Sequence, residues 1–300
     1  MADAAEEEYF ELIEVHDRTF QHYSVINNVY LAPVDEDEEE RLVLEARILL
    51  EVFQNRLFLV PLEYPRQVLE CGYGRGAWAT QMALVYECQV TAIDIYPAEL
   101  SEEPENLVRE IWNLNDRLLP TYRAGQYDLV HSRCVGLGIK KSRWRTYVRD
   151  LGQLTRRGGY VQLAEFYYNI QSDNGRLTEN HAIYKWGVAF RTALDVDKDP
   201  RAYRNFERYL RDAGLTNVQT MSVHIPIGDW STDPRQQAIG LLNRESMEEL
   251  VESHAIYPFT QQLGWTVDQV SELTDQIRDE LNDNSLHLYL PLYIAWGYRR

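Results

Sequence analysis

The sequence predicts an α/β fold with a doubly wound, mostly parallel sheet. Between residues 67 and 166, short apolar runs alternate with stretches of helical periodicity, which is the pattern of βαβ units. A glycine-rich turn follows the first apolar run, and strict alternation over 286–296 predicts a final strand. With 300 residues, 45% of them hydrophobic, the chain is long enough to form one large core, and we expect a single domain overall.

Two helices are predicted before the first strand. Apolar residues keep roughly helical spacing over 9–23, and a stronger stripe covers 42–57. The second helix is expected to begin near Asp35, because the acids there favour the positive end of a helix dipole. Pro61 and Pro65 are expected to end it.

Strands are predicted near residues 67–71, 89–95, 107–112, 127–132 and 158–166. Helices are expected to begin near Gly76, to cover 144–154, and to run from Arg201 to Ala213. Gly214 is a predicted C-cap before a sixth strand near 217–225.

The last part of the chain is predicted to be helical and then extended. Thr266 and Gln269 fit a capping box within a mostly helical segment. Pro291 cannot donate a backbone hydrogen bond, so pairing of the final strand is expected to begin after it or at a bulge. Three parts are therefore expected within the one domain: a helical lid at 1–60, a core at 61–229 and 284–300, and a helical insertion at 230–283.

Charge and cysteine content narrow the function classes. Thirty Lys and Arg against 47 Asp and Glu give a net charge of −17, which opposes binding to nucleic acid. Most of this excess lies in residues 1–51, which hold 15 acids and 3 arginines. Cys71, Cys88 and Cys134 fit neither a zinc site nor a disulfide framework, so free thiols are expected. With no long apolar run and no signal peptide, we predict a cytoplasmic protein without membrane contact.

The glycine-rich turn at 72–76 is the most informative stretch. Glycines at Gly72, Gly74 and Gly76 let the backbone approach a ligand closely where a strand enters a helix. Asp94 ends the second strand, 22 residues after the first glycine, where a carboxylate can accept both hydroxyls of a ribose. The sequence therefore predicts a nucleotide-like cofactor.

Glu70 distinguishes between two candidate cofactors that contain a ribose, a dinucleotide and S-adenosylmethionine. A carboxylate beside the glycine turn would repel the pyrophosphate of a dinucleotide, whereas S-adenosylmethionine carries an ammonium group and no phosphate. After the third strand, Asn113 is expected to hydrogen-bond the adenine amino group and Leu114 to pack on its face. The alternative for Asn113 is a turn residue.

On these residues the chain resembles the class I S-adenosylmethionine-dependent methyltransferases, and more narrowly the fungal LaeA-like methyltransferase family. The resemblance covers nearly the whole chain and includes Tyr30-Leu31, the run 127–133, Gly158-Gly159, and Trp230 in a P-x-G-x-W pattern. It implies a seven-stranded Rossmann-like sheet with an N-terminal helical lid and a helical insertion before the last strand. It also implies that no metal is bound. The residues that it implies for contacts with the cofactor are Tyr30, Glu70, Gly72, Gly74, Gly76, Asp94, Ile95, Asn113, Leu114 and Ser132.

Methyl transfer from a sulfonium depends mainly on positioning the acceptor, with a base only where the acceptor carries a proton. His131 is the first candidate base, because it lies at the carboxyl end of a central strand. A structural histidine beneath the cofactor is the alternative. Glu165 is a second candidate, as base or as partner of a substrate amine, and an ion-paired carboxylate is its alternative.

We predict methylation of O or N of a small secondary metabolite in a fungal biosynthetic pathway. Dense aromatic residues suit an aromatic or alkaloid-like acceptor: Tyr167, Tyr168, Tyr184, Trp186, Phe190, Trp230, Tyr257 and Trp265. One alternative is a LaeA-like regulator, nuclear in location, that works through protein partners at acidic residues 1–40 and basic residues 140–157. The other is a non-methylating cyclase that binds the cofactor.

Overall fold

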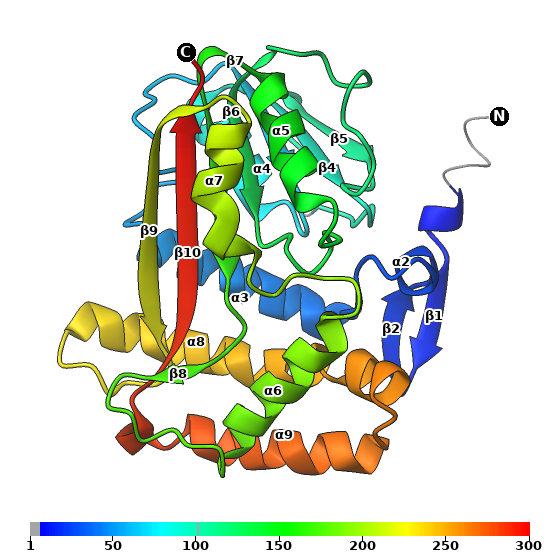
Figure 1. Ribbon diagram of the computed structural model, residues 1–300, viewed down its shortest axis with the longest axis vertical. Helices are drawn as coiled ribbons and strands as arrows, with labels where there is room; N and C mark the ends of the chain where they lie inside the picture. Colours follow the sequence, from blue (N-terminus) through cyan, green and yellow to red (C-terminus); the bar gives the residue numbers. More distant parts are fainter. Residues whose placement is uncertain (1–6, 101) are drawn as a thin grey trace.

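The computed structural model describes residues 7–100 and 102–300 (Figure 1). At its centre is an eight-stranded sheet of order β5-β4-β3-β6-β7-β10-β8, and β9 pairs with the other side of β10. The parallel strands are β3 (Gln67–Cys71), β4 (Gln89–Asp94), β5 (Leu107–Ile111), β6 (Tyr127–Arg133) and β7 (Thr155–Phe166). The antiparallel strands are β8 (Gln171–Ser172), β9 (Thr216–Pro226) and β10 (Leu288–Tyr298). Apart from the two-residue β8, these are the seven predicted strands, and the predicted fold class is confirmed.

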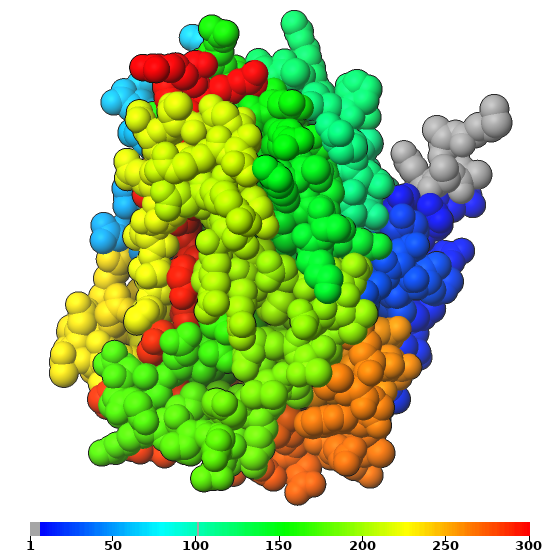
Figure 2. Space-filling model, in the orientation of Figure 1, coloured from blue at the N-terminus to red at the C-terminus, as the bar shows by residue number. Residues whose placement is uncertain are grey.

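Helices cover both faces of the sheet. In Figure 1, α5 (Trp144–Leu154) and α7 (Phe206–Asp212) lie in front and α4 (Ala77–Tyr86) lies behind. Figure 2 shows a narrow strip of β10 between β9 and α7. Below the sheet pack α3 (Glu36–Val52), α6 (Ala182–Leu194), α8 (Pro234–Ser253) and α9 (Val267–Leu281). A short π-helix, Pro258–Gln262, joins α8 to α9, and α6 is a helix that the sequence analysis did not predict.

The helix predicted over 9–23 is wrong. A short 3-10 turn (Glu7–Tyr9) precedes a hairpin of β1 (Leu12–Val15) and β2 (Arg18–Gln21), and the helix α2 covers only His22–Ile26. His16 and Asp17 have φ values of 53° and 61°, which is the geometry of a two-residue hairpin turn. The stabilisation from tertiary packing of this hairpin, including burial of Phe20, exceeds the local preference for a helix that the apolar spacing indicated.

The start of α3 is confirmed at the predicted place. The side chain of Asp35 accepts a hydrogen bond from Glu38 N at 3.2 Å and caps the helix, whose first turn is acidic. The helix ends at Val52, before the predicted end near Leu57. Gln54 and Asn55 have positive φ values, so the chain leaves the helix well before the prolines.

The expectation that pairing begins after Pro291 is confirmed on the side of β7, where the ladder starts at Leu292, but the ladder with β9 runs through Pro291 without a bulge. Its carbonyl accepts a hydrogen bond from Tyr167 N at 2.9 Å, on the side of β7. In a strand the N–H and C=O of one residue point to the same side, so the missing donor also faces that side. There the ladder starts only at Leu292, and no partner on β7 is lost.

The three cysteines are free, as predicted. The capping box of Thr266 and Gln269 is confirmed at the start of α9. The predicted helix 201–213 is present but begins as a 3-10 turn, Ala202–Asn205. No helix in residues 7–100 and 102–300 has the length and apolar character needed to cross a bilayer. The division into lid, core and insertion stays a prediction.

Candidate functional site

A cavity opens at the carboxyl ends of β3, β4 and β6, where ligands bind in open α/β sheets. Its empty volume is about 1210 Å³, part of which is open to solvent. The glycine loop and the ends of the strands form its floor, and α3 with the segment before it covers the other side. Of the predicted cofactor residues, six line this cavity: Tyr30, Gly72, Gly74, Asp94, Ile95 and Leu114.

The glycine loop needs its glycines for different reasons. Gly72, Gly74 and Gly76 all have positive φ values, of 78°, 52° and 71°. A Cβ at Gly72 would lie 2.3 Å from Val135 Cγ1, so this glycine permits close packing of the loop on the next strand end. A Cβ at Gly74 would meet nothing within 4 Å. Gly76 is the N-cap of α4 and does not line the cavity.

The carboxylate of Asp94 hydrogen-bonds to the backbone of the glycine loop. Its Oδ2 accepts a hydrogen bond from Gly74 N at 2.8 Å, and its Oδ1 accepts one from Tyr96 N at 3.2 Å. Burial raises the pKa of this carboxyl, although the backbone N–H groups oppose the shift. Each oxygen keeps a further lone pair, so the group can still accept two hydroxyl donors.

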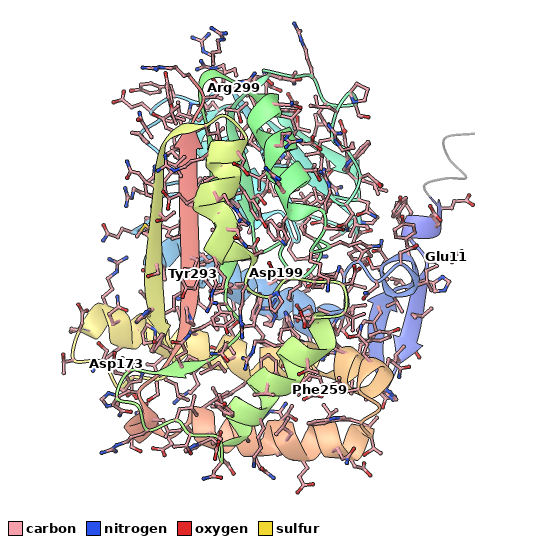
Figure 3. All side chains as sticks on the ribbon, in the orientation of Figure 1. Glu11, Asp173, Asp199, Phe259, Tyr293 and Arg299 are labelled. Atoms are coloured by element: carbon pink, nitrogen blue, oxygen red, sulfur yellow. The ribbon has the colours of Figure 1, made fainter. Side chains whose placement is uncertain are left out.

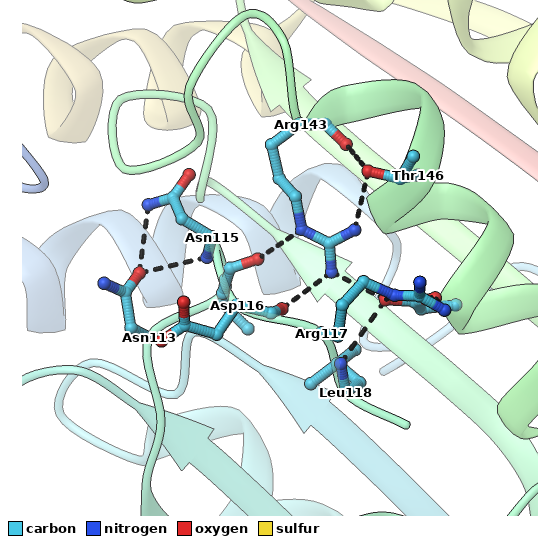
Figure 4. Close-up of polar contacts among 9 residues, drawn as sticks. Asn113, Asn115, Asp116, Arg117, Leu118, Arg143 and Thr146 are labelled. Carbon is cyan, nitrogen blue, oxygen red and sulfur yellow. Dashed lines mark hydrogen bonds and ion pairs between the residues drawn. The ribbon is translucent and has the colours of Figure 1, made fainter. Parts of the chain in front are cut away.

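The segment after β5 differs from the prediction. Asn113 does not line the cavity: its Oδ1 accepts hydrogen bonds from both nitrogens of Asn115, each at 3.0 Å, and Asn115 Nδ2 donates to Gly138 O (Figure 4). Asn113 is therefore a turn residue. The missed residue is Trp112, which lines the cavity and whose buried Nε1 has no hydrogen-bond partner. Its place directly after β5, at the carboxyl end of a parallel strand, was the available signal.

Glu70 and Ser132 lie behind the wall of the cavity. Ser132 Oγ hydrogen-bonds Tyr147 Oη at 2.9 Å and does not line the cavity. Glu70 is 1% exposed, and its Oε2 has no hydrogen-bond partner. Burial raises the pKa of Glu70 to about 8, against the positive charge of nearby Arg133.

The helix α3 contributes acids that the sequence analysis missed. Glu38, Glu39 and Glu45 of α3 line the cavity, and Glu39 forms an ion pair with Arg75 of the glycine loop. Tyr30 Oη lies 3.5 Å from Glu38 Oε1. Spacing of three and seven residues along a helix puts 38, 41 and 45 on one face, and this was the signal that the pattern held.

The prediction of His131 as a base is wrong for this structure. Its ring stacks on Trp78 with centroids 4.0 Å apart, it is fully buried, and it does not line the cavity. Neither ring nitrogen has a hydrogen-bond partner. Burial, with the charge of Arg133, holds the pKa of His131 well below its usual range. A base must reach the proton that it removes, so the structural alternative fits.

We expect His131→Phe to keep methyl transfer and its pH profile. The buried imidazole stays neutral while the unfolded one binds a proton below pH 6.5, so this group lowers stability as the pH falls. Between pH 7.5 and 5.5 the wild type should lose about 1.4 kcal/mol that the variant keeps. Urea unfolding at both pH values checks this, with exposed His224→Phe as the control. A pH profile that loses its fall at low pH in His131→Phe would contradict the structural role.

Glu165 lines a second, smaller cavity next to the first. Its carboxylate accepts hydrogen bonds from Val135 N at 2.9 Å and Gly136 N at 3.0 Å, in the loop that separates the two cavities. Burial raises its pKa to about 8, although these two donors oppose the shift. Asp199 lies at the rim, between α7 and α6 (Figure 3). Glu165 is therefore placed to meet an acceptor, and its role stays a prediction.

The predicted aromatic residues divide among this cavity, the core and the surface, where Tyr184 is 44% exposed. Tyr168 and Phe190 line the second cavity, together with Trp144, Phe166 and Tyr203. By contrast, Trp186 Nε1 donates to Val251 O at 2.7 Å and Trp230 Nε1 to Leu288 O at 2.8 Å, so both are structural. The Nε1 of Trp144 is buried without a partner.

The lining of the first cavity suits a positively charged ligand that also carries a polar aromatic ring. Its lining carboxylates outnumber its arginines: Asp35, Glu38, Glu39, Glu45 and Asp94 against Arg75 and Arg133. Such a field favours a sulfonium and disfavours a pyrophosphate. The unpartnered Trp112 Nε1 and the open space above Gly74 leave room for contacts with a ligand. The residues present therefore fit S-adenosylmethionine.

We expect Gly74→Ala to weaken binding of S-adenosylmethionine by at least about tenfold. Its Cβ would stand in the open cavity, while the positive φ costs only about 1 kcal/mol of stability. Gly125→Ala is the matched control, because Gly125 also has a positive φ and no atom near its Cβ, but it lies outside the cavity. Calorimetric titration should show weak binding only for Gly74→Ala. Equal affinity in both variants would contradict a ligand above this glycine.

Residues 44–253 match the model of the methyltransferase domain family. The chain is 27% identical over 277 residues to methyltransferase pytC of Aspergillus terreus, which covers 91% of this chain and 83% of the relative. It is 26% identical to probable methyltransferase tdiE of Emericella nidulans, covering 87% and 82%. It is 24% identical to the secondary metabolism regulator laeA of Aspergillus fumigatus, covering 92% and 74%.

Among solved structures, one similar chain is a putative methyltransferase from an antibiotic biosynthesis pathway of Anabaena variabilis. The TM-score is 0.51 at 14% identity, and the match covers 84% of this chain and 95% of that one. At this identity the likeness shows the fold alone. It agrees with the parallel-rich sheet and the covering helices described above.

Proposed function

The chain belongs to the methyltransferase domain family and depends on S-adenosylmethionine, and we propose that it methylates an oxygen or nitrogen of a small aromatic or alkaloid-like metabolite in a fungal biosynthetic pathway. The observation that carries the proposal is the pair of adjoining cavities. The first is acidic and suits the cofactor, and the second has aromatic walls that suit a planar acceptor. Similarity to the fungal methyltransferases pytC and tdiE supports methyl transfer, and similarity to the secondary metabolism regulator laeA supports a link to secondary metabolism.

When bound, S-adenosylmethionine supplies a methyl group activated by the sulfonium. The chain would hold the ribose at Asp94 and the adenine beside Trp112 and Leu114. The loop between the cavities would set the distance of the acceptor from the methyl, which is the main catalytic requirement. Glu165 would hydrogen-bond the acceptor and, when ionised, take up its proton. The second cavity is narrow, so the proposal includes a shift of Tyr168 or Tyr203 on binding.

Mass spectrometry after incubation with methyl-labelled S-adenosylmethionine tests the proposal. The purified protein is given a fungal metabolite extract in one reaction and soluble fungal proteins in another. Label in one small molecule supports the proposal and identifies the acceptor. Label in protein alone favours the regulatory alternative, and turnover of an unlabelled product without S-adenosylhomocysteine favours a non-methylating cyclase.

A LaeA-like regulatory role is the second candidate, favoured by similarity to the laeA relatives along most of the chain. The basic residues proposed for partner docking are, however, largely engaged within the chain. Arg143 pairs with Asp150, Arg145 with Asp212, and Arg156 with Asp128. This engagement weakens the argument for a basic docking surface, so we place the regulatory role second.

A further inference from the structure

Arg133 is the last residue of β6, and its side chain lines the cofactor cavity. It is only partly exposed, and within the part of the chain that the structure describes it has no hydrogen bond or ion pair. The other arginines near the cavity are engaged: Arg75 pairs with Glu39, and Arg41 with Glu38 and Glu45. A half-buried guanidinium without a partner points to an anionic ligand.

A second positive group lies beside it. Arg133 also lines a small space with Ala77 and Trp78, the first two residues of α4. This ten-residue helix has no side-chain cap, since its N-cap is Gly76. Its first N–H groups therefore add the positive end of a helix dipole to the charge of Arg133. The two groups converge at the edge of a cavity that is otherwise acidic.

The groups around Arg133 limit the size and charge of the anion that it can bind. Glu70, two residues deeper on the neighbouring strand, opposes a large or doubly charged anion such as a phosphate. A single carboxylate suits both the fork of the guanidinium and the limited positive charge. S-adenosylmethionine carries one carboxylate, at the end opposite to its adenosine.

We propose that Arg133, together with the N-terminus of α4, binds the methionyl carboxylate of S-adenosylmethionine and so distinguishes it from cofactor molecules that lack this group. The inference rests on the placement of the cofactor proposed above. Asp94 lies at one end of the cavity and would hold the ribose, while Arg133 lies on another strand and would hold the amino-acid end. Two anchors of opposite charge fix the direction of the cofactor and aim its methyl group.

The test compares two probes, S-adenosylmethionine and decarboxylated S-adenosylmethionine, by calorimetric titration of the purified full chain. The wild type should bind the first about 10- to 100-fold more tightly. Arg133→Gln should lose most of this preference, with weaker binding of S-adenosylmethionine and little change for the decarboxylated probe. Arg133→Lys should restore part of the preference, because it keeps the charge but not the fork.

Two control variants distinguish a wrong role for Arg133 from a wrong placement of the cofactor. Arg47→Gln removes another arginine that lines the space beside Arg133 but not the cofactor cavity, and it should change neither affinity. Asp94→Ala should weaken both probes equally. If it does so while Arg133→Gln weakens both probes equally or neither, the role of Arg133 is refuted and the cofactor site stands. If Asp94→Ala affects neither probe, the site itself is misplaced and the inference falls with it.

Discussion

Arg41→Met is expected to lower the free energy of unfolding by about 3 to 5 kcal/mol. The side chain of Arg41 is 2% exposed, and it donates hydrogen bonds to Glu38 at 2.9 and 2.8 Å and to Glu45 at 2.9 Å. Burial alone would raise the pKa of Glu38, but the guanidinium outweighs it and the pKa is lowered. Methionine keeps the length of the side chain and removes the charge, so two carboxylates stay buried without a counterion.

Urea unfolding at pH 7 measures this loss, and an exposed pair provides the control. Arg211 and Glu207 form an ion pair with i, i+4 spacing and exposed side chains, and Arg211→Met should cost less than about 1 kcal/mol. Combining Arg41→Met with Glu38→Gln and Glu45→Gln should recover much of the stability, because no buried charge then remains. A loss below about 1 kcal/mol for Arg41→Met alone would contradict the buried network.

The same network connects stability with the cofactor cavity. Glu38 and Glu45 face the cavity from α3, and Arg41 fixes both. The helix α3 therefore depends on an ion-pair network as well as on apolar packing. The sequence pattern places these residues on one face of the helix, but it does not reveal which face meets the cavity, because that depends on packing against α8.

The cofactor loop was predictable because its requirements are local. Glycines at a strand-to-helix turn and an acid after the next strand fix a geometry that needs no distant contacts, and Gly74 and Asp94 lie where expected. The depth of a residue along a strand was harder to predict. His131 and Arg133 share one side of β6, but His131 lies about 7 Å deeper and stacks on Trp78 instead of reaching the cavity.

Tertiary contacts decided the other differences. Residues 12–21 form a hairpin because its turn accepts positive φ values and Phe20 is buried, which no window of local periodicity records. Asn113 is used within its own turn, where Asn115 competes for its oxygen. In both cases the residue types were compatible with more than one structure, and packing of Phe20 in the core and the contact of Asn115 with Gly138 O selected one.

Asp94→Ala is expected to weaken binding of S-adenosylmethionine by about 10- to 150-fold, or about 1.5 to 3 kcal/mol, the scale of hydrogen bonds to a charged group. The carboxylate is half-buried and has no cation partner in the described residues, so its removal leaves no charge unpaired. The fold should therefore survive, with loss of the contacts to Gly74 N and Tyr96 N. Asp94→Asn keeps an acceptor without the charge and should lie between the wild type and Asp94→Ala.

Asp128→Ala is the matched control for this prediction. Its carboxylate accepts hydrogen bonds from Arg66 N and Gln67 N at 2.8 and 2.7 Å, much as Asp94 does, but at the opposite end of the parallel strands. We expect Asp128→Ala to lower stability and to leave affinity for the cofactor unchanged, because its donors do not line the cavity. Calorimetric titration of the three variants separates the two effects. Affinity of Asp94→Ala within about twofold of the wild type would exclude the ribose from this carboxylate.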